Sequence, residues 1–444
     1  MKTLFLTSFN PFISRNILST DVFKQLRTRS DLRIVLFVPD YKVDYFKQRF
    51  ALPNIVIEGI VVERNNRQDV IFSYFGSSLV DSATLAIHKR EKLSRDKNYF
   101  KFLLSFVLRK IIGKFNFFKK IIRFFDLATI NTSALTKYFD QYKPQAVFAT
   151  DVFNNDDVHF LAAAKKKGVR TIGMIRSWDN VTTKGVFRVK PNKLITHNEI
   201  IKGEVIREND FLSENLFVSG IPQFDRYLQS KRLSREEFFK KIGLDPNKKL
   251  IMFSPFGNRF FKLDWQIIEI LKELNQQVLV RLTPNDKVPL ENLKPDPLIY
   301  VDQPGHQFRS DYLRDTELDE RDLDWLADSL YYSDVVVACG TSIVLDAAVF
   351  DKPSVLIYFD GFEKNLSYIH SARKNMDFDH VRLVLNKKGA RMARSKEELL
   401  ANVRDFLEHP EADQQYRQSV LKEQAWKLDG GAGVRIAQFI FNNL

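Results

Sequence analysis

The chain has 444 residues, of which 44% are hydrophobic and 13% aromatic, and its formal net charge is +13. This length accommodates two to three ordinary domains, and this composition excludes a disordered or fibrous protein. The single cysteine, Cys339, excludes an internal disulfide framework and is typical of a reducing compartment. No apolar run reaches the ~18 residues that span a bilayer, and the opening MKTLFLTSFNPF has too short an apolar core for a signal peptide. We therefore expect a cytoplasmic protein.

Strand and helix patterns alternate through the first half of the chain. The strands that we predict there are KTLFLTSF, LRIVLFVP, NIVIEGIVV, AVFATD, RTIGMI, KLITHNE and NLFVSG. Runs such as RIVLFV show no polar alternation, so we expect both faces of these strands to be buried. Buried strands that alternate with helices predict a parallel sheet covered on both faces.

Most of the excess positive charge lies in one helical segment. From Lys89 to Arg123, twelve Lys and Arg stand against Glu91 and Asp96. Apolar residues recur every three or four positions, which predicts one helical face made of Phe100, Leu104, Val107, Ile111, Phe115, Phe118, Ile122 and Phe125. We interpret about 89–127 as a basic amphipathic insert whose part from about 97 to 127 docks on an anionic membrane. The alternative is a core helix with a solvated basic face. We predict no nucleic-acid partner, because no base-stacking motif accompanies the charge.

The alternation restarts after a charged stretch that ends in the turn signal Asp245-Pro246-Asn247. The new strands are LIMFSPFG, VLVRLTP, LIYVD, VVVACG and PSVLIYFD. The predicted fold is therefore α/β, with two tandem Rossmann-like, doubly wound domains facing each other across a cleft. We place them at 1–228 and 248–422, joined by a linker at 229–247. The remaining segment, 423–444, is predicted as a helix that packs back on the first domain.

A buried strand of the second domain ends at Gly340, Thr341 and Ser342, where a helix begins. Ligands of open α/β sheets bind beyond the carboxyl ends of the strands. The free N–H groups and the positive dipole end of this helix suit the phosphates of a nucleotide diphosphate. Asp346, one turn later, is placed to accept a hydrogen bond from a ribose hydroxyl. The alternative is an ordinary helix cap followed by a solvated aspartate.

Four stretches, SDVVVACGTSIVLDAAVFDKPSVLIYFDG, RLTPND, VSGIPQFD and DGGAGVRIAQFI, resemble the GT-B glycosyltransferases. The nearest branch holds capsule-polysaccharide transferases, CDP-glycerol glycerophosphotransferases and nucleotide-sugar 2-epimerase-like proteins. The resemblance extends over about 190–444 and implies that the donor nucleotide binds in the second domain. Gly257, Arg281 and Thr283 then join the expected donor site, although Arg281 could instead extend to solvent. Many members end the strand VLVRLTP with His-Pro. Thr283-Pro284 stands here, which disfavours glycerophosphate transfer.

The first domain is then expected to hold the acceptor and the general base. Asp151 and Asp179 emerge at predicted strand ends and are the candidate bases. The stretch RSWDNVTTKG adds a cation, a sugar-stacking aromatic ring and polar donors, namely Arg176, Trp178, Asn180 and Lys184. The alternative is a turn whose tryptophan fills the core. Ser8, Asn10 and Arg15 flank the first strand–helix turn and are candidates for an acceptor phosphate, although a helix cap with a salt-bridged arginine would look the same.

These features predict a metal-independent glycosyltransferase that moves a sugar from a nucleotide-sugar donor to a cell-surface polysaccharide or a lipid-linked acceptor. No paired cysteines or spaced histidines suggest a metal or another cofactor. The alternatives are a CDP-glycerol-type glycerophosphotransferase, a nucleotide-sugar epimerase and a non-catalytic nucleotide-sugar or membrane-binding scaffold. The basic insert places the protein peripherally on the inner face of the cell membrane.

Overall fold

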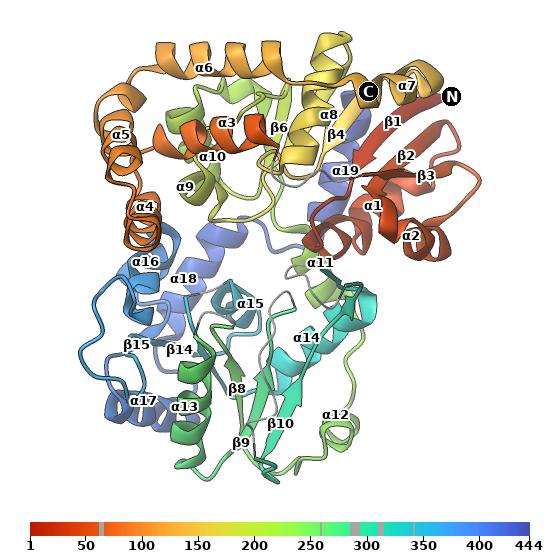
Figure 1. Cartoon of the computed structure of the whole chain (residues 1–444). Coiled ribbons are helices and arrows are strands. Elements are labelled where there is room, and N and C mark those ends of the chain that lie inside the picture. The colour runs from red at the N-terminus through yellow and green to blue at the C-terminus, as the bar shows by residue number, and fades with distance from the viewer. Residues whose placement is uncertain (62–65, 258–259, 285–293, 310–314, 341) are drawn as a thin grey trace. The chain divides into compact units, whose positions relative to one another are not determined.

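The computed structural model describes residues 1–61, 66–257, 260–284, 294–309, 315–340 and 342–444 (Figure 1). The chain forms two compact units. The first comprises Met1–Asp225 and Ala425–Leu444, and the second comprises Arg226–Gln424. Each unit is built on one parallel sheet, which confirms the predicted α/β class with two doubly wound domains.

The first unit holds a seven-stranded sheet in the order β3-β2-β1-β4-β5-β6-β7. Its strands are β1 (Lys2–Thr7), β2 (Leu32–Pro39), β3 (Ile55–Ile60), β4 (Ala146–Ala149), β5 (Arg170–Met174), β6 (Lys193–Thr196) and β7 (Leu216–Val218). All neighbouring strands pair in parallel. One face of the sheet packs against α1 (Asp21–Arg27), α2 (Val43–Phe50) and α19 (Ala432–Asn442), and the other packs against α7 (Ser133–Tyr142) and α8 (Asn155–Lys166).

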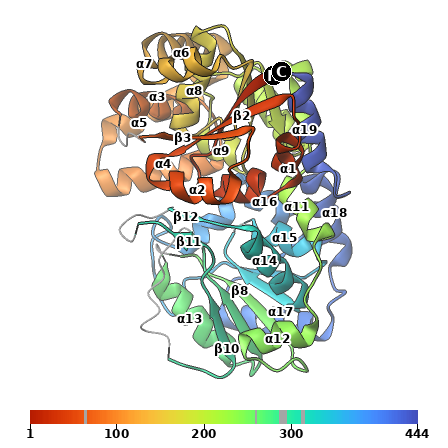
Figure 2. The ribbon, with the colours of Figure 1, turned by 90° about the vertical axis from the view of Figure 1, so that its right-hand side faces the viewer.

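Three further helices of this unit follow the strands, α9 (Asn180–Lys184), α10 (Glu199–Asn209) and α11 (Pro222–Gln229), the last of which crosses into the second unit. The C-terminal helix α19 runs along α1 (Figure 2). Gly433 makes this approach possible, because a Cβ there would lie 2.9 Å from both the Asp21 Cβ and the Val22 nitrogen. The N–H of Gly433 also donates to Asp225 Oδ2 at 2.7 Å.

The insert between β3 and α7 is not the single helix expected over about 97–127. It contains α3 (Arg67–Ser78), α4 (Ala83–Asp96), α5 (Tyr99–Lys110), a short turn at Ile112–Lys114 and α6 (Asn116–Thr129). The break lies at Gly113, where a Cβ would come within 2.2 Å of the Leu79 carbonyl oxygen. The chain therefore turns where it crosses the backbone of Leu79, and the predicted apolar stripe is divided between two helices.

The second unit holds a six-stranded parallel sheet in the order β10-β9-β8-β13-β14-β15. Its strands are β8 (Leu250–Ser254), β9 (Gln277–Arg281), β10 (Ile299–Asp302), β13 (Val335–Ala338), β14 (Ser354–Ile357) and β15 (Arg391–Ala393), and a separate antiparallel pair joins β11 (His306–Gln307) to β12 (Thr316–Glu317). Its helices are α12 (Arg235–Ile242), α13 (Phe261–Lys272), α14 (Glu320–Tyr332), α15 (Ile343–Val349), α16 (Asp379–Asn386), α17 (Lys396–Glu408) and α18 (Gln414–Ala425). Helices α13 and α17 share one face of the sheet, and α14 lies on the other (Figure 1).

The stretch 229–247, expected as a linker, carries a packed helix of the second unit. Helix α12 begins with a capping box in which Ser234 and Glu237 each bond the other's backbone N–H. Phe238 is fully buried, and its ring centroid lies 5.1 Å from that of Trp325 and 5.0 Å from that of Tyr332 on α14. The charged residues that suggested a linker occupy the outer side of this helix.

Candidate active site

The strand order of each sheet reverses at one point, between β1 and β4 in the first unit and between β8 and β13 in the second. Ligands of doubly wound sheets bind beyond the carboxyl ends of the strands at such a point. The residues that follow these four strands and the strands next to them in each sheet are therefore the candidate site of each unit.

Asp151 and Arg176 form a buried ion pair in the first unit. They follow β4 and β5, which are neighbours in the sheet. Arg176 Nε donates to Asp151 Oδ2 at 2.7 Å, and the two side chains are 16% and 5% exposed. Breaking such a pair leaves a buried charge without compensation, so each side chain holds the other in place. Asp151 is therefore better suited to orienting Arg176 than to removing a proton.

Asp157 lies beside this pair, in the first turn of α8. Its Oδ1 accepts hydrogen bonds from the Thr7 hydroxyl and from the Asp151 backbone N–H. Complete burial, together with the nearby charge of Asp151, raises the pKa of Asp157 well above its ordinary value. The surroundings of this side chain therefore favour its protonated, neutral form more than those of an exposed aspartate do. Its second oxygen has no hydrogen-bond partner among the described residues.

Asp179 is the half-buried carboxylate of the same cluster. It lies at the start of the short helix α9, where its Oδ2 accepts a hydrogen bond from the Thr183 hydroxyl at 3.3 Å. Its charge acts on the guanidinium of Arg176, so the two groups are neighbours. A partly exposed carboxylate beside a fixed cation can reach a bound hydroxyl, which makes Asp179 the better placed of the two predicted bases.

Two other residues of this loop lie as the structural alternative expected, in a turn whose tryptophan is buried. Trp178 is only 9% exposed, so its ring lies mostly in the packed interior, which favours the alternative of a tryptophan that fills the core. Asn180 is buried, and its Oδ1 accepts from the Ser177 N–H at 3.0 Å, which closes the turn. Lys184, by contrast, is exposed at the end of α9.

The turn after β1 brings a second arginine to this site. Asn10 Oδ1 accepts from the Phe12 N–H at 3.1 Å, so Asn10 shapes the turn. The guanidinium carbons of Arg15 and Arg176 lie 5.0 and 5.6 Å from the centroid of the same Phe12 ring. Ser8 is buried, and its hydroxyl has no hydrogen-bond partner among the described residues.

His197, in the predicted strand segment KLITHNE, belongs to this cluster, although the sequence analysis gave it no role in the site. It follows β6 and is 2% exposed, and its Nε2 has no partner within the described part of the chain. Burial, followed by the charge of Arg176, lowers the pKa of His197 to about 4. The imidazole is therefore neutral at neutral pH. Its place directly after a buried strand was the only sequence signal, and a core histidine gives the same signal.

One carboxylate fixes the turn after β8 in the second unit by accepting two backbone hydrogen bonds. Asp264 on α13 accepts from the N–H groups of Phe256 and Gly257 at 2.8 and 2.9 Å. Gly257 has a φ of 87°, which a residue with a side chain rarely adopts. The Cys339 thiol after β13 donates to the Pro255 carbonyl at 3.6 Å, which joins the two strand ends.

The predicted phosphate contact of Arg281 is not supported by its surroundings. Arg281 is 6% exposed and pairs with Asp302 at the end of the neighbouring strand β10. The alternative of extension to solvent is excluded as well. Thr283, two residues later, has a buried hydroxyl with no partner among the described residues, so it stays a candidate ligand contact.

The start of α15 agrees only in part with the phosphate-binding site predicted there. A Cβ at Gly340 would lie 2.8 Å from Val381, so this glycine accommodates a neighbouring side chain. Thr341 lies outside the described residues. Ser342 is exposed, and its side chain makes no capping bond to the helix. Asp346 is not a solvated aspartate, because it is buried and its Oδ1 accepts from the Tyr227 hydroxyl at 2.7 Å, and the ribose contact stays a prediction.

Among the residues that the structure describes, no group of three or more His, Cys, Asp or Glu side chains is arranged to hold a metal ion. The sites thus consist of arginines, carboxylates, hydroxyls and backbone N–H groups. Such groups can bind phosphate and move a proton.

The chain is also similar to known proteins in sequence and in fold. The sequence model of the family described as CDP-Glycerol:Poly(glycerophosphate) glycerophosphotransferase matches residues 162–442. No curated protein matches the chain in sequence.

Solved structures match the whole chain in fold. The UDP-GlcNAc 2-epimerase from Neisseria meningitidis, bound to UDP-GlcNAc, has 11% identity and a TM-score of 0.58, with 100% of both chains covered. The enzyme of the same name from Methanocaldococcus jannaschii, in complex with UDP-GlcNAc and UDP, has 14% identity and a TM-score of 0.55, also with 100% of both chains covered. A glycosyltransferase from Rickettsia africae has 9% identity and a TM-score of 0.51, with 100% of this chain and 99% of that one covered. These identities support the fold alone, and they confirm the predicted GT-B class.

Proposed function

The chain belongs to the CDP-glycerol:poly(glycerophosphate) glycerophosphotransferase family, a family of transferases, and from this membership we propose that it transfers a sugar from a nucleotide-sugar donor to a glycan or lipid-linked acceptor. The presence of Thr283 favours sugar transfer over glycerophosphate transfer. Many members have a histidine at this strand end, whereas Thr283 offers a buried hydroxyl. A hydroxyl does not exchange a proton near neutral pH as an imidazole does.

In the proposed reaction, Asp179 removes the proton of the acceptor hydroxyl. The resulting oxygen attacks C1 of the donor sugar, and the bond between C1 and the diphosphate oxygen breaks. Asp151 holds Arg176 beside Asp179, so that a fixed cation lies next to the proposed base. The exposed Ser342 hydroxyl and the first N–H groups of α15 offer hydrogen bonds to the leaving diphosphate. We propose no metal for this step.

Glycerophosphate transfer from CDP-glycerol is the second candidate, because the matching family is named for it. There the acceptor oxygen would attack the phosphorus next to glycerol, and CMP would leave. The same carboxylate could serve as the base. An epimerase remains a weaker alternative, since the 2-epimerases share only the fold at 11–14% identity.

A donor screen separates these candidates. Thermal unfolding is measured with UDP, CDP and their sugar derivatives and with CDP-glycerol, because a ligand at a hundredfold excess over Kd stabilises by ~2.7 kcal/mol. Each binder is then tested for turnover with glycan and lipid-linked acceptors. We expect a nucleotide sugar to be consumed. Turnover of CDP-glycerol alone would replace sugar transfer with the second candidate. A scaffold would bind without turnover, and Asp179→Asn would then change nothing.

We also propose that the segment from α5 to α6, called the docking surface below, binds an anionic membrane. Helix α6 differs from an ordinary core helix, because its buried side is charged and its exposed side is apolar. Its inward side carries charged residues, and its outward side carries Phe117, Phe118, Phe124 and Phe125, which are 41–68% exposed. This spacing places the four rings on one helical face. Phe100, Leu103 and Phe106 continue the exposed apolar surface on α5.

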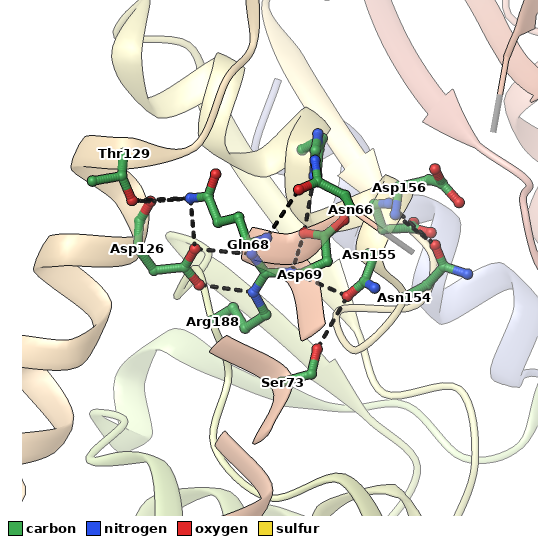
Figure 3. Close-up of polar contacts among 12 residues, drawn as sticks. Asn66, Gln68, Asp69, Ser73, Asp126, Thr129, Asn154, Asn155, Asp156 and Arg188 are labelled. Atoms are coloured by element: carbon green, nitrogen blue, oxygen red, sulfur yellow. Dashed lines mark hydrogen bonds and ion pairs between the residues drawn. The ribbon is translucent and has the colours of Figure 1, made fainter. Parts of the chain in front are cut away.

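The inward side of α6 is bonded to the rest of the first unit through charged groups. Lys119 donates to the Glu208 carbonyl, and Arg123 donates to the Phe187 carbonyl at 2.9 Å. Arg188 makes two hydrogen bonds to Asp126, at 2.7 and 2.8 Å (Figure 3). Lys119 is 3% exposed, so it is not one of the surface cations that the sequence suggested. These bonds hold α6 with its phenylalanines facing out.

The same segment carries four exposed lysines, of which Lys110 pairs with Asp81 and Lys120 with Asp210; they are Lys101, Lys110, Lys114 and Lys120. A patch of aromatic residues with lysines at its margin is complementary to the interface of an anionic bilayer. No helix in the described part of the chain is long and apolar enough to cross a membrane. Surface binding is therefore the form of membrane contact that we propose.

A further inference from the structure

The segment that follows α9 is packed into the insert rather than against the sheet. Val186 belongs to a small buried cluster whose other members all come from the insert, namely Leu79, Val80, Leu85 and Leu108. Leu104 of α5 and Ile122 of α6 pack against the same cluster. Two larger clusters of the first unit lie against its sheet instead. The chain just after the proposed base is therefore held by the core of the insert.

Helices α3 and α4 of the insert contact this segment through its backbone. The Val186 N–H donates to the Gly76 carbonyl, in the last turn of α3, at 3.0 Å. Gly185 has a φ of 92°, and a Cβ there would lie 2.3 Å from the same Gly76 oxygen, so this approach requires glycine. The Ser82 hydroxyl, at the start of α4, donates to the Thr182 carbonyl of α9 at 2.7 Å. Helix α9 therefore rests directly on the insert.

Helix α6 holds the next two residues of the segment. Arg123 on α6 donates to the Phe187 carbonyl at 2.9 Å and to Asn209 Oδ1 at 3.0 Å. The same Asn209 oxygen accepts from the Phe187 N–H at 2.7 Å. Arg188 then donates in the opposite direction, to Asp126 on α6 (Figure 3). Both the backbone and a side chain of the segment are thus bonded to α6.

Helix α9 has only five residues, a length at which a helix is not stable by itself in water. Its position, and that of Asp179 at its N-terminal cap, therefore depends on the contacts with the insert. The opposite side of α6 carries the four exposed rings of the docking surface. One helix thus contacts the segment of the base with its inward side and presents its outward side to the proposed membrane. Coupling between two sites requires an element whose position both sites can influence.

We propose that membrane binding at the docking surface and catalysis at Asp179 are coupled through α6, so that an anionic membrane activates the enzyme. Burial of the exposed rings in a bilayer favours the arrangement of α6 in which they project together. Because α6 is bonded to Phe187 and Arg188, the same arrangement fixes the segment that positions Asp179. Arg123 is then a positioning residue, which acts on the reaction through Asp179. This inference rests on the proposed function, both for the base and for the docking surface.

Trp178 can report on this coupling, because it directly precedes Asp179 in the chain. Its fluorescence is the difference between the emission of the wild type and that of Trp178→Phe. We expect phosphatidylserine vesicles to shift this emission and to raise kcat at least fivefold, with the KM for the donor unchanged. Turnover is measured with the donor found in the donor screen and a short, water-soluble acceptor, which vesicles do not concentrate. If Trp178→Phe does not fold, replacing the other three tryptophans with Phe leaves Trp178 as the reporter.

Arg123→Gln removes the bond from α6 to the Phe187 carbonyl. This variant should bind vesicles within twofold of the wild type and lose both the emission shift and the increase in kcat. Arg123→Lys keeps the charge and part of the bonding, so it should retain part of both responses. Arg95→Gln is the matched control, because it removes the same charge from an exposed position on α4 that pairs with the adjacent Asp96. Asp126→Asn, which weakens the link to Arg188, is the second variant if Arg123→Gln does not fold.

The two readouts separate the coupling from the proposed function. Wild-type protein that binds vesicles without a change in Trp178 emission would overturn the coupling, as would an Arg123→Gln variant that responds as the wild type does. A wild type that does not bind vesicles would overturn the docking surface and the coupling together and leave sugar transfer intact. Sugar turnover that vesicles leave unchanged would preserve the proposed function without the coupling. An emission shift that depends on Arg123, without any donor turnover, would support the coupling and count against the proposed function.

Discussion

Asp151 and Asp179 lie in one cluster but differ in their surroundings. Asp151 is buried in an ion pair with Arg176, whereas Asp179 is half-buried and bonded to a hydroxyl. The pair also explains why two carboxylates can coexist at this strand edge, because Arg176 lies close to both. The surroundings of the two residues therefore favour a positioning role for Asp151 and a proton-accepting role for Asp179.

We expect Asp179→Asn to lower kcat at least a hundredfold, because the contribution of a general base is typically 10²–10⁴. Donor affinity should stay within twofold of the wild type. Asp151→Asn should instead reduce the melting temperature, since it leaves Arg176 without its buried partner. Kinetics and thermal unfolding of both variants check this. Equal kinetic losses with no change in melting temperature would contradict the assignment.

His197 predicts a pH dependence of stability. Its pKa is about 4 in the folded protein against an ordinary 6.5. As the pH falls from about 6.5 to 4, the unfolded chain takes up a proton that the folded protein does not, so the free energy of unfolding decreases. The full loss is about 3 kcal/mol, since one pKa unit corresponds to ~1.4 kcal/mol.

His197→Gln should therefore show a smaller loss of stability between about pH 7 and pH 5 than the wild type. Denaturant unfolding at several pH values measures this difference. His409→Gln is the control, because His409 is exposed and should leave the slope unchanged. An identical slope in His197→Gln and wild type would show that this histidine is accessible to protons in the folded state.

At the scale of single elements, α6 shows how charge can define the buried side of a helix. Three charged residues, Lys119, Arg123 and Asp126, bond to groups elsewhere in the first unit. Asp69 on α3 also bonds Arg188, so α3 and α6 share one buried cation (Figure 3). The exposed rings are thus a consequence of satisfied polar bonds on the opposite side.

We expect the triple variant Lys101→Glu, Lys110→Glu and Lys114→Glu to lose binding to phosphatidylserine vesicles at least tenfold. Each basic residue near an anionic surface contributes ~1 kcal/mol, and reversal adds repulsion. Vesicle sedimentation at low and at physiological salt measures the change. Binding of the wild type should weaken with salt but persist, because burial of the aromatic rings does not depend on salt.

The matched control reverses Lys231, Lys240 and Lys248, which are exposed lysines of the second unit. This variant carries the same change in net charge and should still bind vesicles. If both triple variants lose binding equally, net charge alone explains the attraction. A wild type that ignores vesicles at low salt would rule out the docking surface.

At the scale of the whole molecule, the two ends of the sequence build one core. Ile436, Ala437 and Ile440 of α19 belong to the same buried cluster as Leu4 and Leu6 of β1. The rings of Phe217 and Phe439 stack with centroids 4.4 Å apart. The last helix is therefore an integral part of the first unit, although the second unit precedes it in the chain.

Removal of residues 430–444 should destabilise the first unit and leave the second intact. Each buried aliphatic side chain that is lost costs about 1.5–3 kcal/mol. Hydrogen exchange should rise in α1 and β2 and stay unchanged in β8 and β13. Ile440→Ala serves as a milder variant if the truncated chain does not fold, and Gln438→Ala, at an exposed position, is the control. An equal increase of hydrogen exchange in both units would contradict the prediction that only the first unit depends on α19.

The sequence by itself determined the class of fold and the location of the strand-end residues. Both follow from local patterns, since buried parallel strands read as continuous apolar runs. Only the tertiary structure decided which polar groups pair. Asp346 meets Tyr227 across 119 positions, and Arg176 meets Asp151 across 25. Lys119 faces inward and α5 ends near Gly113 because of contacts with Glu208 and Leu79. The periodicity of a segment does not reveal such distant partners, because it reflects backbone geometry alone.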